Sequence, residues 1–294
     1  MKHVTDYIEF KGLDVYSTYV YDNGKRTGCV RIGDCSVPTT GTFGVSMHGG
    51  MLVLCNYQNI ALAGVAKNED GSTSVQIQRV FETHEINYAH TIRGDTLYAT
   101  GQGAYTETNM RTGAMKRHPY FCSEEQCMHE VLAIAASDAC IYIGCDLGNF
   151  ACIDAATHQV LYTRSFSGGV TWIKLNPRGY AEGSVEVGTY AGEYVVFVGQ
   201  EEVARKALGS IIWRIYPVEA AGAAYNIVAQ SYDGVSLFTE GMELVKNVPT
   251  DDLVYAVRMD SKSSIATGYN YYAGTTVHIS AGPVQELPSA EKPK

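Results

Sequence analysis

The chain has 294 residues, of which 46% are hydrophobic and 18% charged, and its formal net charge is −9. Because no cluster of Lys and Arg is present to bind phosphates, this composition argues against nucleic acid or an anionic membrane as a partner and favours a protein. No stretch of 18 apolar residues and no apolar leader occurs, and the eight cysteines form no Cys-x-x-Cys pair. We therefore expect a soluble cytoplasmic protein with reduced thiols.

One unit recurs along the chain: a β-rich run, a tight turn containing Gly, Asn or Asp, and a second β-rich run. It occurs seven times, at Tyr16–Ile32, Leu52–Val65, Leu97–Met110, Ile141–Asp154, Val185–Val198, Asn226–Phe238 and Ile265–Ile279. Dividing 294 residues among seven units gives 42 residues each, which lies within the range of about 40–45 residues that WD-type blades occupy.

Three of the turns contain residues that tolerate positive φ, as hairpin turns require: Asp22-Asn23-Gly24, Asp146-Leu147-Gly148 and Asp233-Gly234. Ahead of each unit lies a further apolar run, which we expect to form the innermost strand of its sheet. These runs are Tyr7–Phe10, Gly44–Met47, Tyr88–Ile92, Val131–Ala135, Val170–Leu175, Ile211–Ile215 and Leu253–Met259.

Four strands per unit, repeated radially, predict an all-β fold, a single seven-bladed β-propeller of the WD-repeat type over residues 1–282. The tail, residues 283–294, has prolines, charges and no periodicity, so it is predicted to be disordered. The alternative is a β-sandwich with a small second β-domain, which the equal spacing disfavours. A closed ring leaves no sheet edge to pair, so we expect a monomer.

Several short motifs occur in order along nearly the whole chain. The longest, Gly209–Pro217, reads GSIIWRIYP; the others are Ser17–Tyr19 with Gly28, Glu130–Ala135, Tyr142–Asp146, Gly188–Tyr190 with Glu193, Ser231–Gly234 and Asp252–Ala256. Together they resemble the diphthine methyl ester hydrolases, which are WD-repeat proteins of diphthamide biosynthesis. The chain departs from that family at Tyr232, where the family has His, at Leu147 for Asp and at Leu132 for Trp, and no unit ends in Trp-Asp.

The resemblance implies a methylesterase, a hydrolase that removes the methyl ester from the diphthine intermediate on translation elongation factor 2, without a cofactor. The competing hypothesis is a non-catalytic WD-repeat scaffold that binds a protein or peptide on its propeller face. An esterase needs a base and an anion stabiliser within reach of a common point, whereas a scaffold needs only a contact surface. Candidate catalytic groups that prove scattered or buried in separate pairs would favour the scaffold.

Three residues are candidates for the chemistry of ester hydrolysis, which needs a proton acceptor and a group that stabilises the oxyanion. Glu130 and His90 lie in or beside predicted inner strands and are the candidate bases, and Arg214 is the candidate anion anchor. The alternatives are a solvated loop glutamate, a core histidine and an arginine that bridges neighbouring blades. No Gly-x-Ser-x-Gly nucleophile motif occurs, and the stretch Gly44–Gly49 misses it by one residue.

Five further residues are candidates for substrate binding: four aromatic residues, because aromatic faces with a polar tip suit peptides, and one acidic residue in a hairpin turn. They are Trp213, Tyr190, Tyr232, Tyr255 and Asp146. The alternatives are core packing for the aromatic residues and capping of its own turn for Asp146. Strand alternation is expected to direct one of Trp213 and Arg214 between blades and the other to the channel.

A group of possible zinc ligands occurs between the third and fourth units: His118, Cys122, Cys127 and His129. Its Cys-x4-Cys-x-His spacing matches no standard zinc pattern. We therefore predict no metal site there.

Overall fold

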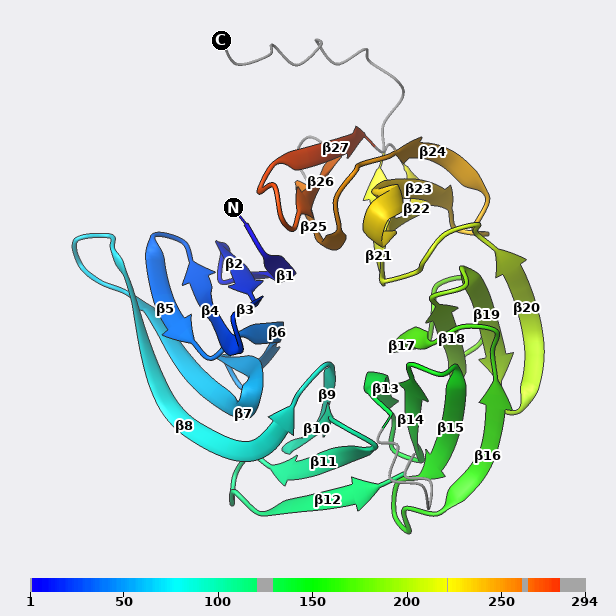
Figure 1. Ribbon diagram of the computed structural model, residues 1–294, viewed down its shortest axis with the longest axis horizontal. Helices are drawn as coiled ribbons and strands as arrows, with labels where there is room; N and C mark the ends of the chain where they lie inside the picture. The colour runs from blue at the N-terminus through cyan, green and yellow to red at the C-terminus, as the bar shows by residue number, and fades with distance from the viewer. Residues whose placement is uncertain (1, 121–128, 221, 261–263, 281–294) are drawn as a thin grey trace.

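The computed structural model describes residues 2–120, 129–220, 222–260 and 264–280; the predicted tail lies outside these residues. Seven antiparallel sheets stand around a central opening, so the protein is a seven-bladed β-propeller (Figure 1). The fold predicted from the repeats is therefore confirmed. Among the described residues, no helix is long and apolar enough to cross a membrane.

Each blade presents its first strand to the central opening (Figure 1). These innermost strands are β1 (Val4–Phe10), β6 (Thr42–His48), β9 (His90–Arg93), β13 (Val131–Ala136), β17 (Val170–Leu175), β21 (Arg214–Ala220) and β25 (Val254–Asp260). They overlap the seven predicted runs, and β17 matches its run at both ends. β21 begins three residues later than predicted, because the Ile212 amide bonds to Thr189 O of the preceding blade instead of to its own sheet.

In blades 2 to 7 the outer strands follow in sequence order. In blades 3 to 7 they are β10 (Thr96–Thr100), β11 (Ala104–Asn109), β12 (Met115–Pro119), β14 (Cys140–Cys145), β15 (Asn149–Asp154), β16 (Val160–Ser165), β18 (Ser184–Thr189), β19 (Glu193–Val198), β20 (Glu201–Ala207), β22 (Ala223–Ala229), β23 (Val235–Thr239), β24 (Leu244–Val248), β26 (Ile265–Asn270) and β27 (Thr276–Ser280). A short 3-10 helix, η1 (Ser231–Asp233), precedes β23. In the described part of the chain, blade 7 has three strands.

Blades 1 and 2 depart from the simple hairpin that the sequence predicts. Blade 1 has four outer strands, β2 (Leu13–Thr18), β3 (Val20–Asp22), β4 (Lys25–Ile32) and β5 (Cys35–Thr39). The chain leaves β2 at Tyr19, whose amide bonds to His3 O. In blade 2, β7 (Met51–Lys67) pairs with β6 up to Asn56 and with β8 (Thr73–Ile86) from Tyr57, and it is irregular at Gln58, which has φ 70°.

Two of the three predicted turns join strands directly, whereas Asp233-Gly234 ends the 3-10 helix η1 between β22 and β23. Asn23 and Gly24, with φ of 48° and 78°, join β3 to β4. Gly148, with φ 84°, joins β14 to β15, and a Cβ at this position would lie 2.5 Å from Phe166 O. The turn therefore needs glycine for both its backbone conformation and its close approach to the next loop.

The core lies between the faces of neighbouring blades. Gly144 in β14 and Gly188 in β18 occupy equivalent positions of successive blades, and a Cβ on either one would collide with an inner residue of the next blade, Val170 or Ile212. These two glycines let the inner strands approach closely. Further from the axis, Phe150, Phe197 and their apolar neighbours fill the space between blades 4 and 5.

The ring closes where blade 1 meets blade 7, with β1 beside β25 (Figure 1). The His3 amide bonds to Tyr271 O at 2.6 Å, and Tyr16, Tyr269, Val4 and Ala256 form a small buried cluster. Inside this cluster the Tyr269 hydroxyl donates to the Tyr16 hydroxyl over 2.9 Å. We call this contact region the seam.

Replacing Tyr269 with Phe should lower the free energy of unfolding by about 1 kcal/mol, because the Tyr16 hydroxyl loses its buried partner at the seam. Tyr232→Phe is the matched control, since the Tyr232 side chain is exposed. Chemical unfolding of both variants checks the prediction. Equal stabilities of the two variants would show that the hydroxyl pair does not contribute to closure.

Candidate functional site

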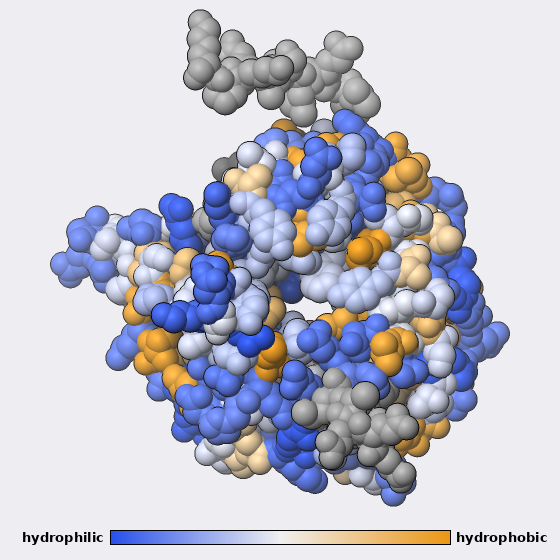
Figure 2. All heavy atoms as spheres, in the orientation of Figure 1, coloured by the Kyte–Doolittle hydropathy of each residue, from blue (hydrophilic) through white to orange (hydrophobic). Residues whose placement is uncertain are grey.

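Two adjoining cavities follow the axis of the ring, and Figure 2 shows the opening at its centre. The mouth cavity has a volume of about 400 Å³ and the channel cavity about 360 Å³. Both are lined by Tyr88, Leu132, Trp213 and Arg214. Because they share these walls, a ligand that enters the mouth meets the side chains that line the channel.

The mouth cavity is lined mostly by aromatic residues: Tyr19, Tyr21, Phe43, Tyr88, Tyr190, Trp213, Tyr255, Tyr271 and Tyr272. On one side, the ring of Phe43 lies 4.2 Å from that of Tyr19 and 5.7 Å from that of Tyr88. On the other side, Trp213 lies 4.7 Å from Tyr255 and 6.1 Å from Tyr190. These residues lie at or beside the ends of strands in six different blades, so the propeller fold alone brings them together.

Glu130 is the one carboxylate among the residues that line the mouth cavity. Its Oε1 accepts a hydrogen bond from the Tyr88 hydroxyl at 2.5 Å. Burial, followed by this bond, raises the pKa of Tyr88. Tyr88 therefore stays protonated at neutral pH, and its hydroxyl donates to one oxygen of Glu130. It does not bond the other oxygen, Oε2.

Arg214 forms an ion pair with Asp6, with 2.5 Å between Nη1 and Oδ1. Asp6 is 2% exposed and also accepts the amides of Tyr7 and Val45, at 2.8 and 2.9 Å. Burial opposes the charged form of Arg214, but Asp6 and Tyr216 together outweigh it and raise the arginine pKa. Arg214 therefore stays charged, and its ion pair with Asp6 neutralises the guanidinium charge at the junction of the two cavities.

His90 and Ser46 both line the channel cavity and form a hydrogen bond, with 2.6 Å between His90 Nε2 and Ser46 Oγ. Burial and then the nearby charge of Arg214 lower the pKa of His90 to about 4, so its imidazole is neutral at pH 7. The stretch that contains Ser46 shows no nucleophile motif, and Ser46 was therefore missed. Alternation along β6 is the available signal, because it places Ser46 on the same face as Gly44, which lies against the His90 ring.

The three candidate catalytic residues thus line one continuous space but are held by separate partners. Glu130 bonds Tyr88, His90 bonds Ser46, and Arg214 pairs with Asp6. Glu130 lines only the mouth cavity and His90 only the channel cavity. An esterase needs a base and an anion stabiliser within reach of a common point, so this arrangement favours a binding scaffold.

Of the five candidate binding residues, Trp213, Tyr190 and Tyr255 line the mouth cavity, and Tyr232 and Asp146 are not among its lining residues. Tyr232 lies in η1 and is 57% exposed. Asp146 Oδ1 is buried without a hydrogen-bond partner among the described residues. Trp213 and Arg214 both line both cavities, instead of being divided between blade interface and channel, because Trp213 precedes the first residue of β21.

Acidification should destabilise the protein through His90. Its folded-state pKa of about 4 lies below the ordinary 6.5, so between these values the unfolded chain binds a proton that the folded chain does not. The free energy of unfolding should therefore fall as the pH decreases through this window, by up to about 3 kcal/mol. Urea unfolding of wild type and His90→Gln at several pH values checks this. An identical pH dependence in both proteins would contradict it.

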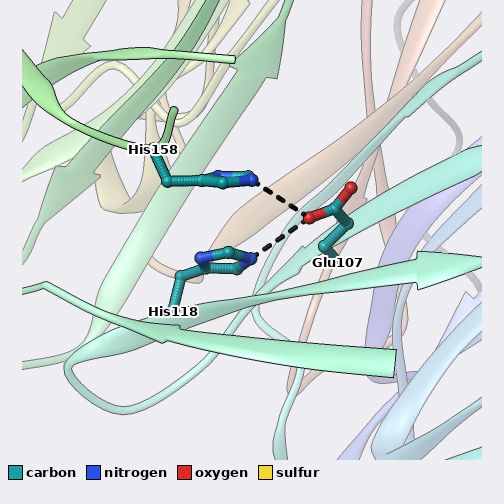
Figure 3. Close-up of side chains that lie close together, drawn as sticks. All are labelled: Glu107, His118 and His158. Carbon is teal, nitrogen blue, oxygen red and sulfur yellow. Dashed lines mark hydrogen bonds and ion pairs between the residues drawn. The ribbon is translucent and has the colours of Figure 1, made fainter. Parts of the chain in front are cut away.

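A second cluster joins blades 3 and 4 (Figure 3). Glu107 Oε2 lies 3.1 Å from His118 Nε2 and 3.4 Å from His158 Nε2, and the two imidazole rings stack with 3.9 Å between their centroids. The three ligand atoms lie within 4.8 Å of one another, close enough for one metal ion. However, the ring planes differ by only 26°, so their nitrogen lone pairs run side by side instead of converging. We interpret the cluster as an inter-blade contact.

Only part of the predicted zinc group can be placed. Cys122 and Cys127 lie outside the described residues. His118 belongs to the inter-blade contact with Glu107, and His129 Nδ1 lies 4.0 Å from Asp146 Oδ1. The two histidines therefore have acidic neighbours of their own.

Comparison with known proteins identifies the fold. No protein-family model and no curated protein sequence matches the chain. Among solved structures, the β-propeller domain of Cps50 (Swd1) from Myceliophteria thermophila is similar, with a TM-score of 0.68, 13% identity, and coverage of 95% of this chain and 96% of that chain. The computationally designed Ika8 protein is also similar, with a TM-score of 0.58, 12% identity, and coverage of 94% and 96%. At these identities the likeness shows the β-propeller fold alone.

Proposed function

We propose that this WD-repeat-type propeller is a scaffold that binds a segment of a partner protein in its mouth cavity. The observation that carries the proposal is the aromatic lining of a cavity of about 400 Å³ by residues from six blades. Tyr and Trp side chains supply large contact areas with little loss of conformational entropy, and they dominate the binding energy of many protein interfaces. The separate pairing of Glu130, His90 and Arg214 supports binding over catalysis.

Selection from a peptide library tests this function. Peptides of random sequence are selected on the wild-type protein, and the affinity of each is then measured for Trp213→Ala and Leu244→Ala. Leu244 is exposed on β24, at the outer edge of its blade, and serves as the control. Trp213→Ala should weaken binding by about 30-fold or more, as expected for a central aromatic residue. Unchanged affinity in this variant, for every selected peptide, would refute binding at the mouth.

A second candidate function is removal of the methyl ester from diphthine on elongation factor 2. The observation that favours it, beside the sequence resemblance, is the Ser46–His90 contact of 2.6 Å in the channel cavity. In this proposal Ser46 Oγ attacks the ester carbonyl while His90 Nε2 takes its proton. His90 gives that proton to the methoxy oxygen as its bond to the carbonyl carbon breaks, so methanol leaves and Ser46 is acylated. A water molecule then hydrolyses the acyl-serine, again with His90 as the base.

Methanol release from elongation factor 2 that carries methylated diphthine tests this candidate. Ser46→Ala and His90→Gln should each lower the rate by about 1,000-fold or more, as losses of a nucleophile or its base do. Ser36→Ala, which changes an exposed serine of β5, is the matched control. Glu130→Ala and Arg214→Ala, compared in the same assay, test the two other predicted residues. Release that is absent in wild type, or unaffected in both Ser46→Ala and His90→Gln, would eliminate this mechanism.

A further inference from the structure

The charge of the mouth cavity is set by Glu130. Among its lining residues, Arg214 is neutralised by Asp6, and no Lys or Arg of the described chain forms an ion pair with Glu130. Burial raises the pKa of Tyr190 and Tyr271 to about 12, so their hydroxyls stay neutral at physiological pH. The cavity therefore combines neutral aromatic walls with a single negative charge.

This combination suits a cation. Aromatic faces carry negative electrostatic potential and attract an ammonium group, and a carboxylate adds to that attraction. An anion would meet Glu130 without a free positive partner. A purely apolar group would bury Glu130 without compensation, which is costly.

Beside the mouth cavity, the Arg26 guanidinium already makes cation–π contacts with two tyrosine rings. The Arg26 guanidinium carbon lies 4.4 Å from the centre of the Tyr57 ring and 4.9 Å from that of Tyr21. Arg26 Nε also donates to the Tyr19 hydroxyl at 2.9 Å. Arg26 is not among the residues that line the mouth cavity, so it leaves the space between Glu130 and the inner aromatic rings available.

We propose that the mouth cavity binds a methylated alkylammonium group carried by the partner segment. Methylation is favoured because the aromatic walls offer ring faces, and Glu130 is the one carboxylate in the lining that can accept from N–H groups. An ammonium with fewer N–H groups leaves fewer donors unsatisfied on entering such a cavity. The inference rests on the proposed binding of a partner at the mouth and names the group that the mouth selects.

Choline and 3,3-dimethyl-1-butanol test the inference directly, because they have the same shape and differ in whether a nitrogen cation or a carbon stands at the centre. Binding is measured by NMR titration and by tryptophan fluorescence. Trp213 lines the mouth cavity, and Trp172, the other tryptophan, donates to Glu186 and lines the channel cavity but not the mouth cavity. Choline should bind at least 10-fold more tightly than the neutral compound. Glu130→Gln should remove most of this preference and Trp213→Leu should weaken both compounds, while Leu244→Ala should change neither.

Equal binding of choline and 3,3-dimethyl-1-butanol to the wild type, or an undiminished preference for choline in Glu130→Gln, would overturn the inference. Near-ultraviolet circular dichroism establishes that each variant is folded. The proposed scaffold function fails separately, when the selected peptides bind Trp213→Ala as tightly as wild type. Peptide binding that depends on Trp213 without any preference for choline would retain the scaffold function and reject the cation.

Discussion

Replacing Asp6 with alanine should lower the free energy of unfolding by about 3–5 kcal/mol. The substitution leaves the Arg214 guanidinium in the channel wall without its partner, and it also removes the acceptor of the Tyr7 and Val45 amides. A buried charge that loses its counter-ion is more costly than the pair it came from, because its desolvation is no longer compensated. Chemical unfolding monitored by circular dichroism gives the measurement.

Two further variants separate the ion pair from other effects of this substitution. Glu9→Ala removes an exposed carboxylate from the same strand, β1, and should change stability by less than about 0.5 kcal/mol. Asp6→Ala combined with Arg214→Met removes both charges and should recover part of the loss, because no charge remains unpaired. If the double variant is as unstable as the sum of the single variants, the two side chains do not act as a pair.

Replacing Phe150 with alanine should lower the free energy of unfolding by about 3–5 kcal/mol. Phe150 is fully buried between blades 4 and 5, with its ring centroid 6.0 Å from that of Phe197 and 6.1 Å from that of Tyr142. The truncation removes contacts with both blades and leaves a cavity that two rigid sheets cannot close. Thermal and urea unfolding should both report the loss.

Two controls accompany Phe150→Ala: a smaller truncation at the same residue, and a truncation at an exposed residue of the same blade. Phe150→Leu keeps most of the apolar volume and should cost less than half as much as alanine. Val160→Ala, at an exposed residue of β16 in the same blade, should have little effect. A loss at Phe150 no larger than the loss at Val160 would mean that the blade interface repacks freely.

Local sequence patterns predicted the blades well where each strand pairs only within its own sheet. The run Val170–Leu175 matches β17 at both ends, and the glycine turns join the strands they were expected to join. The predictions were displaced where the backbone bonds to another blade. Ile212 bonds to Thr189 of the preceding blade, and no local periodicity records such a contact.

The site was predictable in part for a related reason. The position of Glu130 at the start of an inner strand indicated that it lies at the mouth, and it lines the mouth cavity. Alternation predicted that only one of Trp213 and Arg214 reaches the channel, whereas both do. Their partners were not indicated, because Asp6 and Arg214 are 208 residues apart and Ser46 and His90 are 44 apart. A single sequence shows which residue types can form such pairs, but which residues come into contact depends on the closed propeller fold.

The seam links binding at the mouth cavity to the stability of the closed ring. His3, Tyr19 and Tyr271 bond the two ends of the described chain to each other, and the same three residues line the mouth cavity. A ligand bound in the mouth cavity therefore stabilises the contact between the first and last blades. By mass action, it raises the resistance of the folded chain to heat and proteolysis as its concentration increases.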